Sequence, residues 1–347
     1  QAAKEKGIAV RAVKKASKDA PDSQLQGAAP EVMNVFKNEE AVRANGNLIG
    51  GTAWLFSTLD SELDCLFVDE AGQVSLANLI ACSGAARNLV LLGDQMQLGQ
   101  PTQGVHPGQS GDSALDYLLD GAATIAPDKG IFLATTWRMH PDICSFISQA
   151  IYEGRLQPEP RNARRTLVLP ADAHPFLRPS GIVHVPIQHA HCSQRSLEEA
   201  QLTKAIYESA LQAHFTDAQG VQHPITQDNI LVVAPYNLQV KLLLKTLPEG
   251  ARVGTVDKFQ GQEAEVVIVS MTTSSESDLP RHLEFLYSKN RLNVAISRAK
   301  CLAIVLASPG LLAIHCQHPQ DMALVNTLCW LSEQYGSDLT PTSDASS

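Results

Sequence analysis

The segment Val253–Ser270, VGTVDKFQGQEAEVVIVS, decides the fold of this chain. A short apolar stretch ends at Thr255, a polar Gly-containing turn follows, and a strongly apolar run comes next. Short runs rich in Val, Ile and Leu are typical of strands that are covered on both faces. Similar runs occur at 65–69, 89–92, 130–134, 181–186, 229–234, 265–271 and 301–307. The segment therefore predicts one strand of a buried sheet.

Helical patterns lie between these runs. From Ser196 to His214, five apolar residues share one helical face: Leu197, Leu202, Ile206, Ala210 and Leu211. Ser196 followed by Glu199 predicts a capping box at the start of this helix. The alternation of short strands and helices predicts an α/β fold with a mainly parallel sheet.

Bulk properties bound the class of protein. The 347 residues are enough for about two domains, and 44% are hydrophobic. A run of about 20 apolar residues, which a bilayer span requires, does not occur, so we expect no membrane association. The net charge of −9 disfavours a general nucleic-acid coat but allows a local basic track, as at Lys289–Lys300. Gln1 is not followed by a signal-peptide pattern, and we expect that the chain begins within a longer protein.

The seven Cys residues lack the close spacings of zinc sites. We interpret them as reduced thiols, which predicts a cytoplasmic location. The eleven His residues also lack ligand spacing, and we interpret His184, His189 and His191 as strand and loop residues. The irregular stretch at 121–130 indicates a boundary between two parts of the chain. The irregular stretch at 157–180 indicates a linker or an insertion.

The first chemical motif is LFVDEAGQ, residues 66–73, where a buried strand ends on two carboxylates. Asp69 could hold Mg²⁺ through water, and Glu70 could polarise an attacking water. The alternative is a pair of acids that open the next loop and cap the helix that begins at Ser75. The motif alone does not decide between them.

Two further motifs end strands. In 88–101, NLVLLGDQMQLGQP, Gln97 could touch a γ-phosphate and a water together, or simply lie in a turn. In 135–148, TTWRMHPDICSFIS, Arg138 precedes a helix that begins with Pro141 and Asp142. This Arg could reach a phosphate pocket, although a surface ion pair is the commoner role of one Arg.

The late motifs are similar in kind. Thr255 closes a strand, and Gln260 and Glu263 lie in the turn that follows, which could face a nucleotide or be a plain β-turn. In 289–300, KNRLNVAISRAK, Arg298 could act as an arginine finger, or the segment could be a basic helix that packs on the sheet. All these side chains lie at strand ends in one progression, which is where ligands bind in open α/β sheets.

This order of motifs resembles superfamily 1 helicases, in particular the branch that contains the nonsense-mediated-decay RNA helicase and DNA helicase–nucleases. DEAGQ resembles motif II, GDQMQLGQP motif III, WRMHP motif IV, TVDKFQGQEAEVVIVS motif V and RLNVAISRAK motif VI. The resemblance covers roughly 48–307. The segment around WRMHP also resembles bacterial proteins that fuse a RecB-like nuclease to such a helicase.

The resemblance implies two RecA-like lobes of the P-loop NTPase type, with ATP and Mg²⁺ bound between them. It implies that Asp69 binds magnesium, Glu70 orients the hydrolytic water and Gln97 senses the γ-phosphate. Arg138 and Arg298 would reach in from the second lobe.

The resemblance implies roles for further residues. Trp137 would lie beside the base, and Glu263, with Gln260 and Gly261 on the same turn, would contact the nucleotide. Thr52, in the motif Ic segment IGGTAWLFS, and Thr255 would grip the backbone of single-stranded DNA or RNA.

The sequence departs from the family at one point, because it contains no Gly-rich loop with Lys-Ser or Lys-Thr (Walker A). We expect a truncated first lobe at 1–128, a second lobe at 129–335 and a flexible tail at 336–347. We expect an ATP-dependent helicase in the intact parent, which could also carry a nuclease domain, and an inactive isolated chain. The alternative is a non-catalytic helicase-like module that binds nucleic acid or protein.

Overall fold

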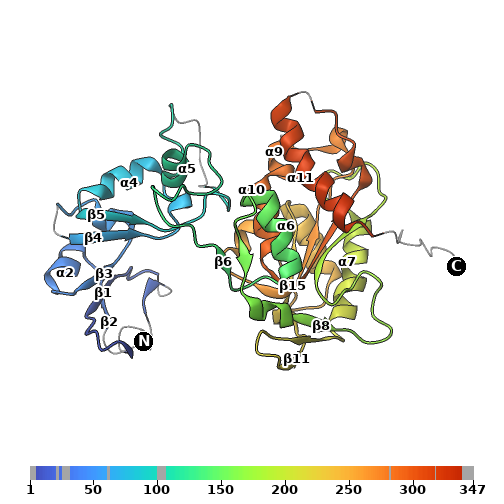
Figure 1. The fold of residues 1–347 in the computed structure, drawn as a ribbon, viewed down its shortest axis with the longest axis horizontal. Coiled ribbons are helices and arrows are strands. Elements are labelled where there is room, and N and C mark those ends of the chain that lie inside the picture. The colour runs from blue at the N-terminus through green and yellow to red at the C-terminus, as the bar shows by residue number, and fades with distance from the viewer. Residues whose placement is uncertain are drawn as a thin grey trace. The chain divides into compact units, whose positions relative to one another are not determined.

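The computed structural model describes residues 5–20, 23–25, 32–60, 63–99, 107–280, 283–316 and 318–337. The chain divides into two compact units (Figure 1). Unit 1 comprises residues up to Gln95 together with Gly99–Gly121, and unit 2 comprises Met96–Leu98 together with the chain from Ala122 onward. The division falls at 121/122, whereas we predicted a boundary at 128/129. Most of the predicted tail at 336–347 lies outside the described residues.

Unit 2 is built on a five-stranded sheet in which every pairing is parallel. Across the sheet the strands are β13 (Arg252–Gly254), β12 (Ile230–Val233), β14 (Ala264–Ser270), β15 (Ala299–Ala307) and β9 (Gly181–Pro186). All residues of β14 are buried. The parallel α/β prediction is confirmed, and the predicted strand at 181–186 matches β9 in both bounds.

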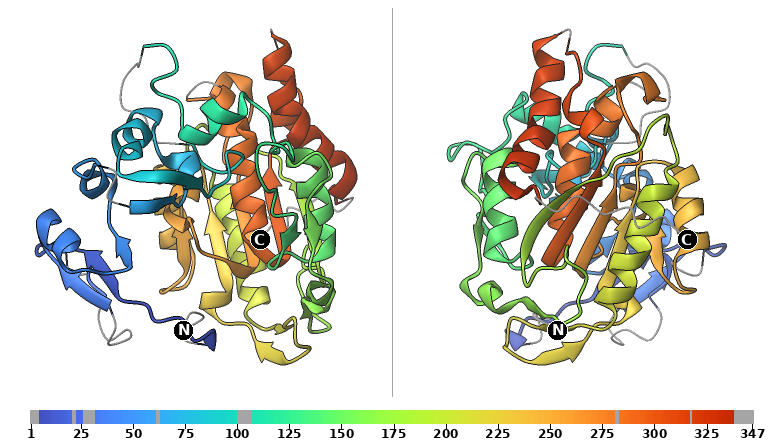
Figure 2. Two further views of the ribbon diagram at one scale, coloured as in Figure 1. Left: turned by 60° about the vertical axis from the view of Figure 1, so that its left-hand side comes forward. Right: turned by 90° about the vertical axis from the view of Figure 1, so that its right-hand side faces the viewer.

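Both faces of this sheet are covered, because successive side chains of a strand point to opposite faces. Val266 and Ile268 of β14 pack in one hydrophobic cluster, whereas Val267 and Val269 pack in the other. The two layers of helices flank the strands in Figure 2. The first cluster includes residues of α7 (Leu197–Ala210) and α8 (Asn237–Thr246). The second includes residues of α6 (Pro141–Ile151), α9 (Leu283–Tyr287), α10 (Lys289–Ser297) and α11 (Pro319–Tyr335).

The start of α7 differs from the predicted capping box. Ser196 is the N-cap, and its Oγ accepts a hydrogen bond from the backbone N–H of Glu199 at 3.1 Å. The return bond is absent, because the Ser196 backbone N–H donates to Gln239 Oε1 at 2.9 Å. The reciprocal half of the prediction was wrong, since the Glu199 side chain is buried and bonded elsewhere.

The predicted strand at 130–134 was also wrong. Ile131 and Leu133 are 86% and 79% exposed, and only β6 (Thr135–Thr136) pairs in this region, with β7 (Gln157–Pro158). An apolar run becomes a strand only where a neighbouring strand offers backbone partners. The irregular stretch at 157–180 is part of unit 2, and it contains β8 (Thr166–Val168). β8 joins a small antiparallel sheet with β10 (His214–Thr216) and β11 (Gln222–Pro224).

Unit 1 contains two small parallel sheets. One has the order β2 (Val32–Val35), β1 (Ala12–Lys15) and β3 (Leu48–Gly50), and the other pairs β4 (Leu63–Val68) with β5 (Ala86–Leu91). The described residues of unit 1 also form α2 (Asn38–Arg43), α3 (Ala53–Phe56), α4 (Leu76–Ser83) and α5 (Ala114–Leu119). Within the part of the chain that the structure describes, no helix has the length and apolarity to cross a membrane.

His184 in β9 gives the fold a testable dependence on pH. The side chain is 1% exposed, and its ring nitrogens have no hydrogen-bond partner among the described residues. Burial disfavours the charged imidazolium and lowers the pKa of His184 to about 4, from about 6.5 in an unfolded chain. Between these values the unfolded state takes up a proton that the folded state does not. The free energy of unfolding should therefore fall by up to about 3 kcal/mol as the pH falls through this window.

Denaturant unfolding at pH 7 and pH 4.5 measures this effect. His184→Leu should make the free energy of unfolding less dependent on pH, whatever its effect at pH 7. His315→Leu is the matched control because that side chain is 98% exposed, and it should keep the slope of the unmodified chain. An unchanged slope in His184→Leu would contradict the account of His184.

Candidate functional site

Three of the predicted site residues come together at the amino edge of the sheet in unit 2. Glu263 directly precedes β14, and Arg298 directly precedes β15. Arg138 reaches the same edge from the segment between β6 and α6. Its Nε donates to Glu263 Oε2 at 2.8 Å, and its Nη1 donates to the carbonyl oxygen of Ser297 at 3.2 Å. These two hydrogen bonds thus join Arg138 to residues that follow it in the sequence by 125 and 159 positions.

The backbone beside Arg138 is fixed by contacts on both sides. The N–H of His140 donates to the carbonyl oxygen of Lys300 at 2.9 Å, and Asn162 Nδ2 donates to the carbonyl oxygen of Thr136 at 3.2 Å. His140 is also the N-cap of α6, where its Nδ1 accepts from the N–H of Asp142 at 3.2 Å. The segment from Thr136 to His140 therefore has little freedom to move away from β15.

Charge pairs extend along this edge. Lys300 Nζ lies 3.0 Å from Glu263 Oε1 and 3.2 Å from Glu265 Oε1. Partial burial alone would raise the pKa of the Glu263 carboxyl group, but the hydrogen bonds from Arg138 and Lys300 outweigh it and hold this pKa below its usual value. Glu263 is therefore an ionised group that two cations hold.

Arg298 holds the turn that contains Gln260, Gly261 and Glu263. Its guanidinium is buried, at 3% exposed, and its Nη1 donates to the carbonyl oxygen of Gln262 at 2.9 Å. Arg252 Nη2 binds the Oε1 of the same Gln262 at 2.6 Å. Gly261 adopts φ +73°, which a residue with a side chain rarely accepts, so the turn needs glycine there. In this structure Arg298 contacts protein backbone.

The location of these residues corrects the strand-end prediction. Open α/β sheets usually bind ligands outside the carboxyl ends of their strands. Glu263 and Arg298 instead lie at amino ends, whereas Thr255, which follows β13, lies at the carboxyl edge. The sheet thus carries Glu263 and Arg298, which we predicted to act on the nucleotide, at one edge. Thr255, which we predicted to contact the nucleic-acid backbone, lies at the opposite edge.

Gln97 belongs to unit 2 although it follows β5 in the sequence. Its carbonyl oxygen accepts from Asn290 Nδ2 at 2.6 Å, and the carbonyl oxygen of Met96 accepts from Asn293 Nδ2 at 2.9 Å. Both Asn residues lie on α10, whose C-cap is Arg298. Trp137, next to Arg138, has an exposed side chain. Sequence reasoning had given Asn290 and Asn293 no role.

In unit 1 the two acids lie at the tip of β4, as predicted, but the predicted burial of this strand was wrong, because Phe67 is 63% exposed and Leu66 is the one buried residue of β4. Asp69 and Glu70 are exposed, and Asp69 Oδ1 accepts from the N–H of Glu70 at 3.0 Å. Glu70 has the left-handed backbone conformation, with φ 52° and ψ 41°. Ser75, not an acid, caps α4 by accepting from the N–H of Asn78. Thr52 precedes α3, is exposed, and makes no cap hydrogen bond.

Two glycines allow the acidic turn to lie against the next strand end. A Cβ at Gly93 would lie 2.7 Å from the N of Ala71, and a Cβ at Gly72 would lie 2.8 Å from the O of Asp94. Both contacts are with backbone, which cannot move aside cheaply. Backbone contact therefore sets the position of Asp69 and Glu70 relative to Asp94.

Exposed carboxylates at a strand tip fit the way in which proteins hold magnesium on a nucleotide, since one or two carboxylates act together with phosphate oxygens and waters. A metal site made by protein alone needs more ligands. No group of three or more His, Cys, Asp or Glu residues arranged to hold a metal ion occurs within the described ranges.

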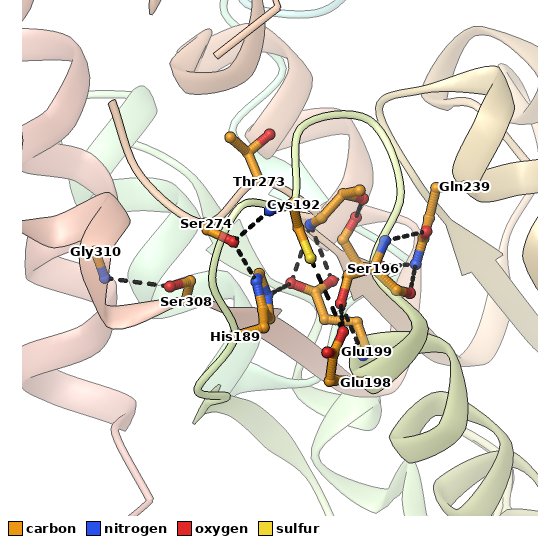
Figure 3. Close-up of polar contacts among 12 residues, drawn as sticks. His189, Cys192, Ser196, Glu198, Glu199, Gln239, Thr273, Ser274, Ser308 and Gly310 are labelled. Atoms are coloured by element: carbon orange, nitrogen blue, oxygen red, sulfur yellow. Dashed lines mark hydrogen bonds and ion pairs between the residues drawn. The ribbon is translucent and has the colours of Figure 1, made fainter. Parts of the chain in front are cut away.

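A second polar cluster lies at the carboxyl edge of the same sheet (Figure 3). Glu199 of α7 is fully buried and accepts from Ser270 Oγ and from the backbone N–H of Thr272. His189 Nε2 lies 3.0 Å from Glu199 Oε1, and His189 Nδ1 lies 2.7 Å from Ser274 Oγ. Thr272 has φ 75°, a strained value for a β-branched residue, and the bond to Glu199 fixes it.

The Glu–His–Ser order of this cluster also occurs in hydrolytic triads, but here it joins two loops. Ser274 Oγ accepts from the N–H of Cys192 at 2.9 Å, and the N–H of Ser274 donates to the carbonyl oxygen of Cys192 at 2.8 Å. Glu199, His189 and Ser274 are all buried, so a substrate has no access to Ser274. The cluster ties the loop after β9 to the loop after β14.

The fold and the site define a parallel α/β domain whose amino edge carries paired charges, with Arg138 and Lys300 held against Glu263. The family described as "AAA domain" matches residues 112–309, and the chain belongs to this family, among the superfamily 1 helicases that its motifs predicted.

Three relatives illustrate the match. The chain is 28% identical to the DNA polymerase alpha-associated DNA helicase A of Schizosaccharomyces pombe, over 78% of this chain and 42% of the relative. It is 28% identical to the ATP-dependent helicase upf1 of that organism, over 72% and 27%. It is 31% identical to the DNA-binding protein SMUBP-2 of Rattus norvegicus, over 68% and 24%. The chain thus spans less than half the length of these relatives.

Among solved structures, the arterivirus nonstructural protein 10 helicase aligns with a TM-score of 0.44 and 15% identity, over 93% of this chain and 51% of that chain.

Gly93→Ala tests the backbone contact beside the acids. The added methyl group would push against the N–H groups of Ala71 and Gly72, and overpacking of this kind costs about 1–3 kcal/mol. Gly84→Ala is the control, because nothing lies within 4 Å of its added Cβ. Thermal unfolding should show a lower Tm for Gly93→Ala and no loss for Gly84→Ala. Equal Tm values for the two variants would contradict the contact.

Proposed function

We propose that this chain is part of an ATP-dependent nucleic-acid helicase or translocase, in which ATP is hydrolysed between two RecA-like lobes. The observation that carries the proposal is the amino edge of unit 2. Arg138, Glu263 and Arg298 lie together there, and α10 ties the Gln97 segment to the same edge. The names of the relatives, which include DNA helicases and an ATP-dependent helicase, support the same reading.

The proposed reaction is ATP + H₂O → ADP + phosphate. Magnesium bound with the nucleotide would neutralise charge on the phosphates. Asp69 would hold the metal, Glu70 would orient the attacking water, and Gln97 would contact the γ-phosphate. Arg138 and Arg298 would stabilise charge that develops on the phosphates in the transition state.

The second half of the proposal concerns the nucleic acid. Thr255 at the carboxyl edge of unit 2 and Thr52 in unit 1 would contact the backbone of single-stranded DNA or RNA. In unit 2, Thr255 and the Arg138–Glu263 pair lie at opposite edges of one rigid sheet. A movement of unit 2 toward a bound nucleotide would therefore also move Thr255, which is the kind of coupling a translocase needs.

The ATPase reaction requires a segment that this sequence lacks. Lys and backbone amides of a phosphate-binding loop normally supply much of the electrostatic hold on the transferred phosphate, and the chain contains no such loop. We therefore assign the reaction to a parent protein in which this chain is joined to a phosphate-binding loop, and not to the isolated chain. Unit 1 would be the incomplete first lobe, and unit 2 would be the second.

The missing loop also favours a second candidate, a non-catalytic helicase-like module that binds nucleic acid or protein. The retention of Asp69, Glu70, Arg138 and Arg298 argues against it, since a module without catalysis has no physical need for all four. A Gly-rich loop with Lys-Ser or Lys-Thr encoded upstream in the same frame supports the enzyme. A start codon at this position supports the module.

Glu70→Gln tests the enzyme in the parent protein. The amide should preserve ATP binding but orient the water poorly, so strand-stimulated turnover should fall by about 10²–10⁴-fold. Asp64→Asn is the matched control, since Asp64 is also exposed on β4 and should leave turnover near that of the unmodified protein. Turnover of Glu70→Gln equal to that of the control would overturn the assigned role.

A further inference from the structure

Lys300, the second residue of β15, is shared by two carboxylates of different character. Its Nζ lies 3.0 Å from Glu263 Oε1, at the partly exposed amino edge, and 3.2 Å from Glu265 Oε1, which is buried. One ammonium group therefore connects the interior of unit 2 to the candidate site.

The buried end of this connection is anchored. Glu265 is the second residue of β14, and its Oε2 accepts from Asn229 Nδ2 at 2.8 Å. Asn229 is held in turn, because its Oδ1 accepts from the N–H of Thr226 at 2.9 Å and from Thr226 Oγ1 at 2.8 Å. Burial of a carboxylate is costly without charge pairing and hydrogen bonds, and Lys300 and Asn229 provide both to Glu265. The position of Lys300 is thus set from inside the protein.

The exposed end reaches Arg138 through Glu263. Lys300 contacts Oε1 of the carboxylate, and Arg138 Nε donates to Oε2. With both oxygens occupied, the carboxylate plane cannot rotate without breaking a charge-assisted hydrogen bond. Glu263 therefore holds the Nε side of the guanidinium.

The other side of the guanidinium is available. The structure gives Arg138 only two acceptors among the described residues, Glu263 and the carbonyl oxygen of Ser297, and the side chain is 34% exposed. The planar fork of Arg matches phosphate oxygens best when its orientation is fixed in advance. A guanidinium held by Nε presents its remaining N–H groups in one direction.

We propose that Lys300 is a positioning residue. Through Glu263 it fixes the orientation of the Arg138 guanidinium, and Glu265 and Asn229 fix Lys300. The inference rests on the proposed function, in which Arg138 acts on the phosphates of ATP. Lys300 itself touches neither substrate nor metal in this scheme, and its contribution is the alignment of Arg138.

The first test uses the chain itself and requires no nucleotide. In ¹⁵N-arginine NMR, with the signal assigned by Arg138→Lys, the Arg138 Nε–H should exchange with solvent about tenfold faster in Lys300→Met than in the unmodified chain. In ¹³C titrations the pKa of the Glu263 carboxyl group should rise in the same variant, because one of the two cations that lower it is lost.

Two variants make this test specific. Lys300→Arg keeps a donor for both carboxylates and should retain slow exchange. Lys204→Met removes a lysine that forms an exposed ion pair with Glu208, and it should change neither measurement. Unaltered Arg138 exchange together with an unaltered Glu263 titration in Lys300→Met would overturn the inference, whatever the protein catalyses.

The second test uses the parent protein and separates orientation from stability. Lys300→Met should lower kcat by about tenfold while KM for ATP changes by less than about threefold, and Lys300→Arg should restore most of kcat. Unchanged kcat in a parent that hydrolyses ATP would overturn the inference while leaving the proposed function in place. A parent that hydrolyses no ATP would overturn the proposed function, and the NMR result would then judge the positioning alone.

Discussion

A parallel sheet has to be covered on both faces, and this constraint organises unit 2. β14 contributes a strand in which each residue is buried, with alternate side chains in two separate hydrophobic clusters. Helices therefore occupy both faces of the sheet, and polar chemistry is left to the two edges where strands begin and end. The Arg138–Glu263–Lys300 contacts lie at one edge, and the Glu199–His189 contacts lie at the other.

The two edges use charge in different ways. At the carboxyl edge, Glu199 is enclosed and its acceptor positions are filled by Ser270, Thr272 and His189, so the cluster fixes loops and offers nothing to a ligand. At the amino edge, Glu263 and Arg138 are partly exposed, and the guanidinium has N–H groups to offer. Exposure, more than the number of charges, makes the amino edge the better candidate for phosphate recognition. Helix α10 adds to this edge, since it carries Asn290 and Asn293, which bind the Gln97 segment, and ends at Arg298.

Much of the core of unit 2 could be predicted from the sequence, because buried parallel strands appear as short apolar runs. β9, β12, β14 and β15 all lie where such runs predicted them. The run at 130–134 failed, since apolarity does not reveal whether a partner strand is nearby. The capping box at Ser196 failed for a related reason: the local pattern fits Glu199, but a tertiary contact with Thr272 takes its carboxylate.

The candidate site was predictable in part. The motifs singled out Arg138, Glu263 and Arg298, but spacing could not show that Glu263 and Arg298 lie at amino ends or that Arg298 is buried against the Gln262 carbonyl. The sequence places Lys300 in the basic segment 289–300 and Glu265 at the start of the apolar run 265–271, and it assigns a role to neither. Their role depends on a register in which β14 and β15 lie side by side, and that register is set by packing of the whole unit.

The most direct test of the central claim is a crystal structure of the parent protein with ADP, magnesium and aluminium fluoride, which imitates the phosphoryl group in transit. The account predicts that Nη atoms of Arg138 lie about 3 Å from the fluoride or phosphate oxygens, with Nε still on Glu263 and with Asp69 and Glu70 on the opposite side of the nucleotide. A structure in which the nucleotide binds elsewhere, with Arg138 turned to solvent and away from the paired acids, would contradict it.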